Sequence, residues 1–405
     1  MRAHTTTNKM ASNNSTMLSN DTFLSDRVAL IQQLNDKMAR LMVPATVYIC
    51  IMMVLGLVGN PMVCYYYGAK TKLTTNTFFI VILALYDVIV CAISMPTEIA
   101  DIELFYTFEY NVACKILRFV NYFAGIGSIL TLVAIATDRF KKICRLTKPQ
   151  MGIRTAKFVS LGIIGIAILL SWPSLVIYGS IQVPIPNTYG LDLMGADCTS
   201  TKEVAYQKYV WVFNGVHFLL FVVLSVVLIV LYSIIGHTIF SHKKRLMMYT
   251  PNKNRTPSST EVETSLSDCS QKMEDKMKGT EKGVIKPQTA TQSLFTSIKR
   301  HSTVSKKSTD SHKPSGIDSE AVKITVVMVI VTIVFIVSFL PYLSLTVWRV
   351  VKRQHEAEFL SDAGLVWFKI GSRSFLLNSS LNPWIYGIFN SNFRQFFFGW
   401  ICKKR

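Results

Sequence analysis

Seven long apolar stretches alternate with shorter polar segments along most of this chain. Each is at least about 20 residues long, which is the length that a helix needs to cross the hydrocarbon of a bilayer. The stretches are Val43–Tyr67, Thr75–Ala100, Val112–Lys141, Ala156–Tyr178, Tyr206–Phe240, Ala321–Val350 and Asp362–Phe389. The pattern predicts an all-α membrane protein built as a bundle of seven transmembrane helices.

The polar segments complete the predicted organisation. Residues 241–320 are poor in aromatics and rich in Ser, Thr, Lys and Glu, a composition typical of disorder. Residues 390–405 begin with an amphipathic stretch, which favours a short helix lying in the membrane interface. The predicted divisions are a tail at 1–42, helices one to five at 43–240, a loop at 241–320, helices six and seven at 321–389, and the interfacial helix with a short tail at 390–405.

The composition supports the membrane assignment. Half of the 405 residues are hydrophobic and only 17% are charged, and a soluble chain could not bury this much apolar surface. The formal net charge is +19. Because Lys and Arg lie in short groups between apolar stretches, as in cytoplasmic loops, the charge argues against nucleic acid as a partner.

The positions of the basic groups predict the orientation. They follow the first, third and fifth apolar stretches and end the chain: Lys70, Lys72, Lys141, Lys142, Arg145, Lys148, Arg154, Lys157, Lys243, Lys244, Arg245, Lys403, Lys404 and Arg405. Since Lys and Arg are enriched in cytoplasmic loops, this side is predicted to be cytoplasmic. The N-terminus and the loop with Asp101, Glu103 and Glu109 are then extracellular, as expected for a multi-pass protein of the plasma membrane.

This orientation predicts several covalent modifications. Cys114 and Cys198 are the cysteines in loops placed outside, where a disulfide can persist. Three asparagines of the tail begin Asn-x-Ser/Thr triplets and are candidates for glycosylation: Asn13, Asn14 and Asn20. On the cytoplasmic side, Ser302 and Ser305 lie near basic residues and are candidates for phosphorylation. Cys402 is either a palmitoylation site or a bare thiol.

Short motifs stand in order along the predicted helices. Helix one contains GLVGN, helix two contains LALYD with Asp87, and helix three ends with Asp138–Arg139–Phe140. Helix six contains FIVSFLP and helix seven contains NSSLNPWIY. Together these motifs resemble a rhodopsin-like G-protein-coupled receptor, over residues 44–402. The resemblance implies a receptor rather than an enzyme, and the sequence has no nucleophile–base pair, Walker loop or metal-ligand spacing that argues otherwise.

A polar core is expected in the middle of the membrane. A carboxylate at this depth, such as that of Asp87, marks a functional site with a partner. The nearby polar residues are Asn60, Ser128, Asn378, Ser379 and Asn382. Clustered oxygens suit hard cations, and the resemblance implies that these residues bind a sodium ion in the inactive state. The alternative is a protonated Asp87 in a hydrogen-bonded core. No other cofactor is expected.

The inner end of helix three is the expected activation switch. The guanidinium of Arg139 keeps its proton, so at rest it is expected to pair with Asp138. The resemblance implies that activation moves Arg139 toward Tyr232 and Tyr386 and opens a cytoplasmic cleft for a heterotrimeric G protein. The residues assigned to this switch are Asp138, Arg139, Phe140, Tyr232, Asn382, Pro383 and Tyr386.

The sequence departs from the family pattern near this switch. Phe140 replaces the usual tyrosine, and Phe339 stands where a tryptophan usually precedes the kink proline, Pro341. Ala321 stands where an acid often pairs with the switch arginine. These departures leave open a receptor that is active without a ligand.

The ligand is expected to enter an extracellular cavity. Asn121 replaces the aspartate that holds amines, and Leu376 replaces the lysine that links retinal. The predicted lining is Glu98, Asp101, Arg118, Asn121, Tyr122, Phe213, His217, Tyr342, Thr346, Arg349, Phe368, Ser372 and Arg373. Glu98 is expected to pair with Arg373, and the charged mouth resembles that of neuropeptide receptors. The acidic first outer loop favours a basic or amidated peptide, or is simply solvated.

Other functions remain open at this point. The ligand is a peptide or else a lipid or other small molecule. A transporter or channel would carry inverted repeats, which the sequence does not contain. The partners expected for a receptor are the extracellular ligand, a heterotrimeric G protein, arrestin, receptor kinases and membrane lipids.

Overall fold

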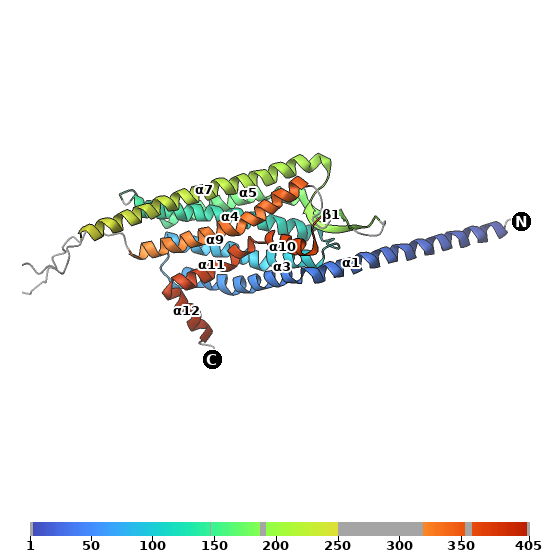
Figure 1. Ribbon diagram of the computed structural model, residues 1–405, viewed down its shortest axis with the longest axis horizontal. Coiled ribbons are helices and arrows are strands. Elements are labelled where there is room, and N and C mark those ends of the chain that lie inside the picture. The colour runs from blue at the N-terminus through green and yellow to red at the C-terminus, as the bar shows by residue number, and fades with distance from the viewer. Residues whose placement is uncertain (1–2, 146, 187–191, 250–318, 353–358, 403–405) are drawn as a thin grey trace, which may run out of the picture. The chain divides into compact units, whose positions relative to one another are not determined.

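The structure is a computed structural model that describes residues 3–145, 147–186, 192–249, 319–352 and 359–402 (Figure 1). Within helices, the side chains of residues 3–24, 243–249, 319–321, 350 and 400–402 are not described. The chain divides into two compact units, residues 1–239 with 319–405, and residues 240–318. The predicted phosphorylation sites, Ser302 and Ser305, lie outside the described residues, as do the side chains of Asn13, Asn14, Asn20 and Cys402.

Nearly all regular structure in the described residues is helical. The helices are α1 (Ala3–Tyr65), η1 (Tyr66–Lys70), α2 (Thr75–Ile89), η2 (Val90–Ser94), α3 (Met95–Glu103), α4 (Asn111–Cys144), α5 (Ile153–Ser171), α6 (Ser174–Ile177), α7 (Val204–Tyr249), α9 (Ser319–Lys352), α10 (Asp362–Gly371), α11 (Leu376–Phe389) and α12 (Ser391–Cys402). The strands are β1 (Tyr178–Pro184) and β2 (Met194–Ser200). The predicted loop at 241–320 is wrong at its start, because α7 continues through residues 241–249.

Six crossings are confirmed as helical stretches long and apolar enough to span a membrane. Among the described residues these are Ser25–Lys70, Thr75–Glu103, Asn111–Cys144, Ile153–Ile177, Val204–His242 and Val322–Arg349. The second stretch has a π-helical segment, η2, just before Pro96. A proline has no N–H to donate, so one backbone hydrogen bond of the helix is missing at Pro96.

The seventh crossing consists of two helices, α10 and α11, where a single span is predicted. Its ends agree with the prediction, but residues 372–375 interrupt it. Here the backbone hydrogen bonds join residues three apart, as in a 3₁₀-helix, rather than four apart. An example is the bond from the N–H of Arg373 to the carbonyl of Ile370 at 3.0 Å. The hydroxyl of Ser374 donates to the carbonyl of Ser338 at 2.6 Å, which ties the break to α9. Serine side chains that bond to backbone groups in this way compete with regular helix.

Helix α1 begins well before the predicted boundary at Val43. Five apolar side chains of the predicted tail recur at helical spacing and pack against the core of the bundle: Leu30, Ile31, Leu34, Met38 and Leu41. Asn35 is buried among them and donates to the carbonyl of Glu103 at 2.9 Å. Its Oδ1 accepts from the backbone N–H of Tyr106 at 3.0 Å. The tail prediction therefore needs correction, because residues 25–42 form part of the folded bundle.

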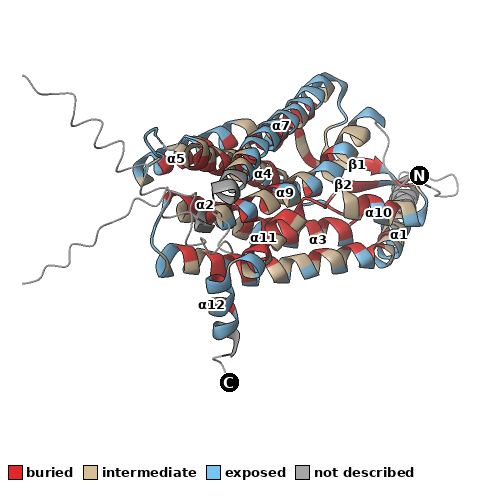
Figure 2. Cartoon of the chain, turned by 60° about the vertical axis from the view of Figure 1, so that its left-hand side comes forward, coloured by how far each residue is buried: buried red, intermediate tan, exposed pale blue. Residues whose placement is uncertain are grey.

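The crossings pack side by side around a buried interior (Figure 2). Helix α1 contacts α2 and α11, α2 contacts α4, α4 contacts α5, and α9 contacts α11. Gly59 lets α1 approach α11 closely, because a Cβ at this position would lie 2.6 Å from Pro383. Large apolar side chains on the outer faces are exposed, such as Phe158 at 75% and Leu219 at 62%. Exposed apolar faces of this kind suit contact with lipid.

A β-hairpin lies at one end of the bundle. Strands β1 and β2 pair antiparallel, with Ser180 opposite Cys198. A disulfide joins Cys198 to Cys114 in the first turn of α4, as predicted. The backbone N–H of Ala196 donates to the carbonyl of Tyr106 at 2.7 Å, which fixes β2 to the connection between α3 and α4. This end is called the disulfide end below, and the opposite end is called the Arg139 end.

Candidate functional site

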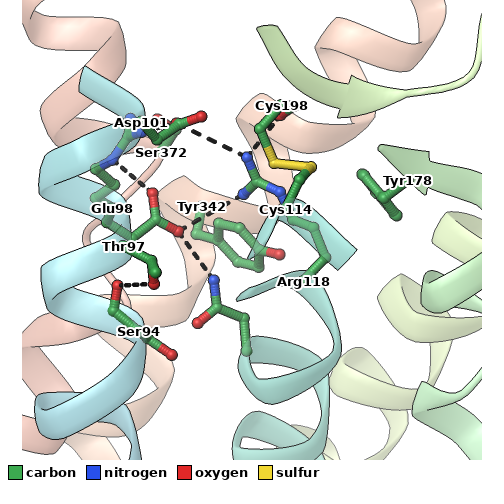
Figure 3. A network of polar contacts seen from close by, with 12 residues as sticks. Ser94, Thr97, Glu98, Asp101, Cys114, Arg118, Tyr178, Cys198, Tyr342 and Ser372 are labelled. Carbon is green, nitrogen blue, oxygen red and sulfur yellow. Dashed lines mark hydrogen bonds and ion pairs between the residues drawn. A yellow bond between two sulfur atoms is a disulfide. The ribbon is translucent and has the colours of Figure 1, made fainter. Parts of the chain in front are cut away.

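A cavity opens at the disulfide end. Residues of α3, α4, α9, α10 and β2 surround it (Figure 3). Its lining is Glu98, Asp101, Arg118, Tyr122, Tyr178, Asp197, Cys198, Thr199, Ser200, Tyr342, Leu345, Thr346, Arg349, Phe368, Lys369, Ser372 and Arg373. This upper cavity contains most of the predicted ligand-binding residues.

Two carboxylates and two guanidinium groups meet on one side of the upper cavity. The Nε of Arg373 lies 2.8 Å from Oε2 of Glu98, so the predicted pair is present. Nη2 of Arg373 also lies 2.5 Å from Oδ2 of Asp101. Arg118 lies farther from the same acids, at 3.6 Å from Glu98 and 3.9 Å from Asp101. Arg373 is therefore the main counter-ion of both acids, and Arg118 is the more loosely held cation.

Local structure explains how these charges meet. Glu98 and Asp101 are three residues apart on α3 and share one face. Arg118 lies one turn beyond Cys114 on α4, and its Nη2 donates to the carbonyl of Cys198 at 2.9 Å. Figure 3 shows the Arg118 side chain between Glu98 and the disulfide. Arg373 comes from the break between α10 and α11, so the network joins α3, α4 and the seventh crossing.

Burial makes this network costly to disturb. The side chains of Glu98, Asp101 and Arg373 are 1%, 3% and 4% exposed, whereas that of Arg118 is 16% exposed. Asn121, one turn along α4 from Arg118, donates from Nδ2 to Oε1 of Glu98 at 2.9 Å. A charge buried in this way is tolerated only where it is paired and hydrogen-bonded. Among these charged groups, Arg118 is the one that a ligand in the cavity can reach most easily.

A second, apolar cavity lies next to the upper one. It is lined by Asn121, Tyr122, Gly125, Ile126, Ile129, His217, Leu220, Phe221, Phe335, Phe339, Tyr342, Leu343 and Phe375. Tyr122 and Tyr342 line both cavities, so they form the boundary between them. The rings of Phe335 and Phe339 stack with centroids 4.4 Å apart. This lower cavity suits an apolar or aromatic group.

Phe213, which is predicted to contact the ligand, is not among the lining residues of either cavity. Its ring packs behind Tyr122 and His217, with centroids 4.7 and 4.2 Å away. His217 lines the lower cavity, and its Nδ1 lies 2.7 Å from the carbonyl of Phe213. Phe213 therefore orients cavity residues from behind.

Sequence reasoning missed the contribution of the hairpin and of Lys369 on α10. Asp197, Thr199 and Ser200 line the upper cavity because the disulfide holds β2 there. The predicted disulfide could have located them, since they flank Cys198. Lys369 is also buried in the lining, with its Nζ 4.4 Å from the ring centroid of Phe105. No sequence signal distinguishes this lysine from a surface lysine.

The polar core forms around Asp87 as the sequence predicts. Nδ2 of Asn382 donates to Oδ2 of Asp87 at 2.8 Å. Asn60 donates to the carbonyl of Ser379 at 2.7 Å, and Ser128 and Asn378 are buried on α4 and α11. Four buried oxygens have no hydrogen-bond partner among the described residues: Oδ1 of Asn60, Asp87, Asn378 and Asn382. Free oxygens of this kind fit a small hard cation.

The part of the chain that the structure describes lacks the clusters of side chains that typically hold metal ions. There, no group of three or more His, Cys, Asp or Glu side chains could hold a metal ion together. A cation at Asp87 would therefore rely on one carboxylate together with amide and hydroxyl oxygens. An all-oxygen donor set of this kind suits a hard cation rather than a soft transition metal.

At the Arg139 end, one carboxylate oxygen forms ion pairs with two cationic side chains. Oδ2 of Asp138 lies 2.7 Å from Nη2 of Arg139 and 2.7 Å from Nζ of Lys142. Asp138 and Arg139 are 1% and 4% exposed, and Tyr232 and Tyr386 are also buried. The expected Asp138–Arg139 pair is present, and Lys142 is a partner that the sequence reasoning missed. Its position four residues beyond Asp138 was the available signal.

Comparisons with known proteins agree with this arrangement. The family described as 7 transmembrane receptor (rhodopsin family) matches residues 59–386. Neuropeptide FF receptor 2 of Mus musculus is 36% identical over 151 residues, which are 36% of this chain and 35% of that receptor.

Two further relatives are receptors with comparable or longer matches. The C3a anaphylatoxin chemotactic receptor of Danio rerio is 32% identical over 131 residues, 32% of this chain and 36% of that receptor. Neuromedin-U receptor 1 of Mus musculus is 26% identical over 250 residues, 60% of this chain and 57% of that receptor. The chain spans about a third of the length of the first two relatives and just over half of the third.

Proposed function

Because the chain belongs to the rhodopsin family of seven-transmembrane receptors, we propose that it binds a neuropeptide at the disulfide end and activates a heterotrimeric G protein at the Arg139 end. The disulfide end would face the cell exterior, where a disulfide persists. Lys141, Lys142 and Arg145 at the other end support a cytoplasmic position. The proposed location is the plasma membrane, and the family favours a receptor over a transporter or channel.

One observation carries the proposal of a peptide ligand. A charged upper cavity adjoins an apolar lower cavity, and Tyr122 and Tyr342 border both. A peptide end offers charged or amide groups together with an apolar side chain, and so matches both surfaces. The relatives named above include receptors for neuropeptide FF and neuromedin-U, which supports the same class of ligand.

The charge network supports a specific route from binding to activation. A basic ligand group attracted to Glu98 or Asp101 has to compete with a guanidinium, and Arg118 has the longer contacts. Displacing it would shift α4 relative to α3 and the seventh crossing. Since α4 also carries Arg139 at its far end, this helix links the two sites. Arrestin and receptor kinases are proposed as further partners of the cytoplasmic face.

The test screens a neuropeptide library on cells that express the receptor, with calcium and cyclic AMP read together. We expect a peptide agonist, and we expect Arg139→Ala to abolish the signal while agonist binding persists. Arg154→Ala is the control, since this arginine is exposed at the same end. Signalling by Arg139→Ala at the control level would contradict the proposed switch. If lipids but no peptides activated the receptor, the proposal of a peptide ligand would be contradicted.

We also propose a sodium site at Asp87. The four partnerless oxygens of the polar core support it, and Ser128 and Ser379 complete a donor set of oxygens. A bound sodium ion would supply positive charge that stabilises the ionised carboxylate. Sodium is expected to lower agonist affinity in the native receptor but not in Asp87→Asn. Equal sodium responses of the two receptors would show that the core is hydrogen-bonded without an ion.

A further inference from the structure

A groove of about 270 Å³ lies where α11 meets α12 at the Arg139 end. Its lining residues include Trp384, Gly387 and Ile388 from α11, and Arg394, Phe397 and Phe398 from α12. This α11–α12 groove belongs to neither the ligand cavities nor the polar core.

The walls of the groove suit a hydrocarbon chain. Ile388 and Phe398 are 65% and 54% exposed, so the groove opens outward. Gly387 leaves room on the α11 side, because a Cβ built there would meet no atom within 4 Å. The rings of Trp384 and Phe397 pack edge to face at 5.4 Å. In a membrane-spanning bundle, an outward apolar groove of this kind faces lipid rather than water.

The rim of the groove carries positive charge. Arg394 is exposed, and its Nη1 donates to the carbonyl of Ile388 at 3.1 Å, which holds the guanidinium beside the groove. Its remaining N–H groups can donate to phosphate oxygens. The indole N–H of Trp384 is buried and has no acceptor among the described residues. The sequence adds Lys403, Lys404 and Arg405 just beyond α12.

From this combination we infer that the α11–α12 groove binds one anionic phospholipid of the leaflet at the Arg139 end. An acyl chain lies along Trp384, Gly387 and Phe397, and the phosphate contacts Arg394. Basic side chains next to membrane-spanning helices attract anionic lipids in this way. Trp384 directly follows Pro383 on α11, so the lipid contacts the helix that carries the proposed switch residues. The site is independent of the identity of the extracellular ligand.

The experiment measures lipid retention by the full-length receptor. The purified protein in detergent is mixed with phosphatidylglycerol or phosphatidylcholine, and bound lipid is counted by native mass spectrometry. The native receptor is expected to retain phosphatidylglycerol in preference to phosphatidylcholine. Arg394→Gln should lower that preference about five-fold, equivalent to the ~1 kcal/mol that one basic side chain contributes near an anionic surface. Gly387→Phe should fill the groove and lower retention of both lipids.

Two controls match these variants. Arg154→Gln removes an exposed cation at the same end, and Gly165→Phe adds a ring on α5 where a Cβ also meets no atom. Both should retain lipid as the native receptor does, and thermal unfolding checks that all variants are folded. Equal retention in Gly387→Phe and Gly165→Phe would overturn the proposal. The proposal would also be overturned if Cys402→Ser were the one variant that retained more lipid than the native receptor. That result would mean that an acyl chain attached at Cys402 occupies the groove in the native receptor.

Discussion

Replacing Arg373 with Met tests the charge network most directly, because this arginine has the shortest contacts with both acids. The variant keeps an apolar chain in place but leaves Arg118, at 3.6 and 3.9 Å, as the arginine that pairs with Glu98 and Asp101. Removing one partner of a buried ion pair costs about 3–5 kcal/mol, since the remaining charge stays buried. Arg118→Met should cost less, roughly 1.5–3 kcal/mol, the value of one hydrogen bond from a charged group.

The assay is unfolding of the purified receptor in mixed micelles, run as a double-mutant cycle with Glu98→Gln. The double variant removes a charge of each sign, so its loss of stability should be smaller than the sum of the single losses by about 1–3 kcal/mol. Lys202→Met, an exposed cation at the same end, is the control and should change stability little. Additive losses, or an Arg373→Met variant as stable as Lys202→Met, would refute the reasoning.

Two further predictions concern the contacts of α1, one a hydrogen-bonded side chain and the other a close helix packing. Asn35→Ala removes the hydrogen-bond partner of both the Glu103 carbonyl and the Tyr106 N–H. In the same assay it should lower the free energy of unfolding by roughly 1–3 kcal/mol. The control, Gln33→Ala at an exposed position, should change it very little. Gly59→Val should lower stability by about 1–3 kcal/mol and reduce surface expression, because its Cβ meets Pro383 at 2.6 Å. A Gly59→Val receptor with native stability would show that α1 can move away from α11 at little cost.

The crossings could be predicted from the sequence because length and apolar composition define them. The last crossing begins and ends at the predicted residues, Asp362 and Phe389. Its interruption could not be predicted, since it depends on the hydroxyl of Ser374 reaching a carbonyl on another helix. The amphipathic start of α1 was missed for a different reason. Its apolar residues recur at helical spacing, but polar neighbours lower the average hydrophobicity.

The sequence predicted most residues of the candidate site, but it did not predict most of the contacts between them. Glu98 and Arg373 were expected to meet because their helices are neighbours in the family. The second contact of Arg373, to Asp101, requires the break between α10 and α11, which the sequence pattern does not reveal. The partnership of Arg118 with the Cys198 carbonyl likewise depends on where the hairpin folds back. Pairings between distant segments therefore needed the three-dimensional structure.

The early start of α1 has a practical consequence for anyone who trims the protein. A shortened version beginning at Val43 would preserve every membrane crossing, yet it would lose Asn35 and the hydrogen bond from Arg27 to the Asp192 carbonyl at 2.6 Å. These contacts join α1 to the end of α3 and to the residue two positions before β2. Cropping at the apolar boundary is therefore expected to keep the apolar stretches and to loosen the disulfide end, where the proposed ligand binds.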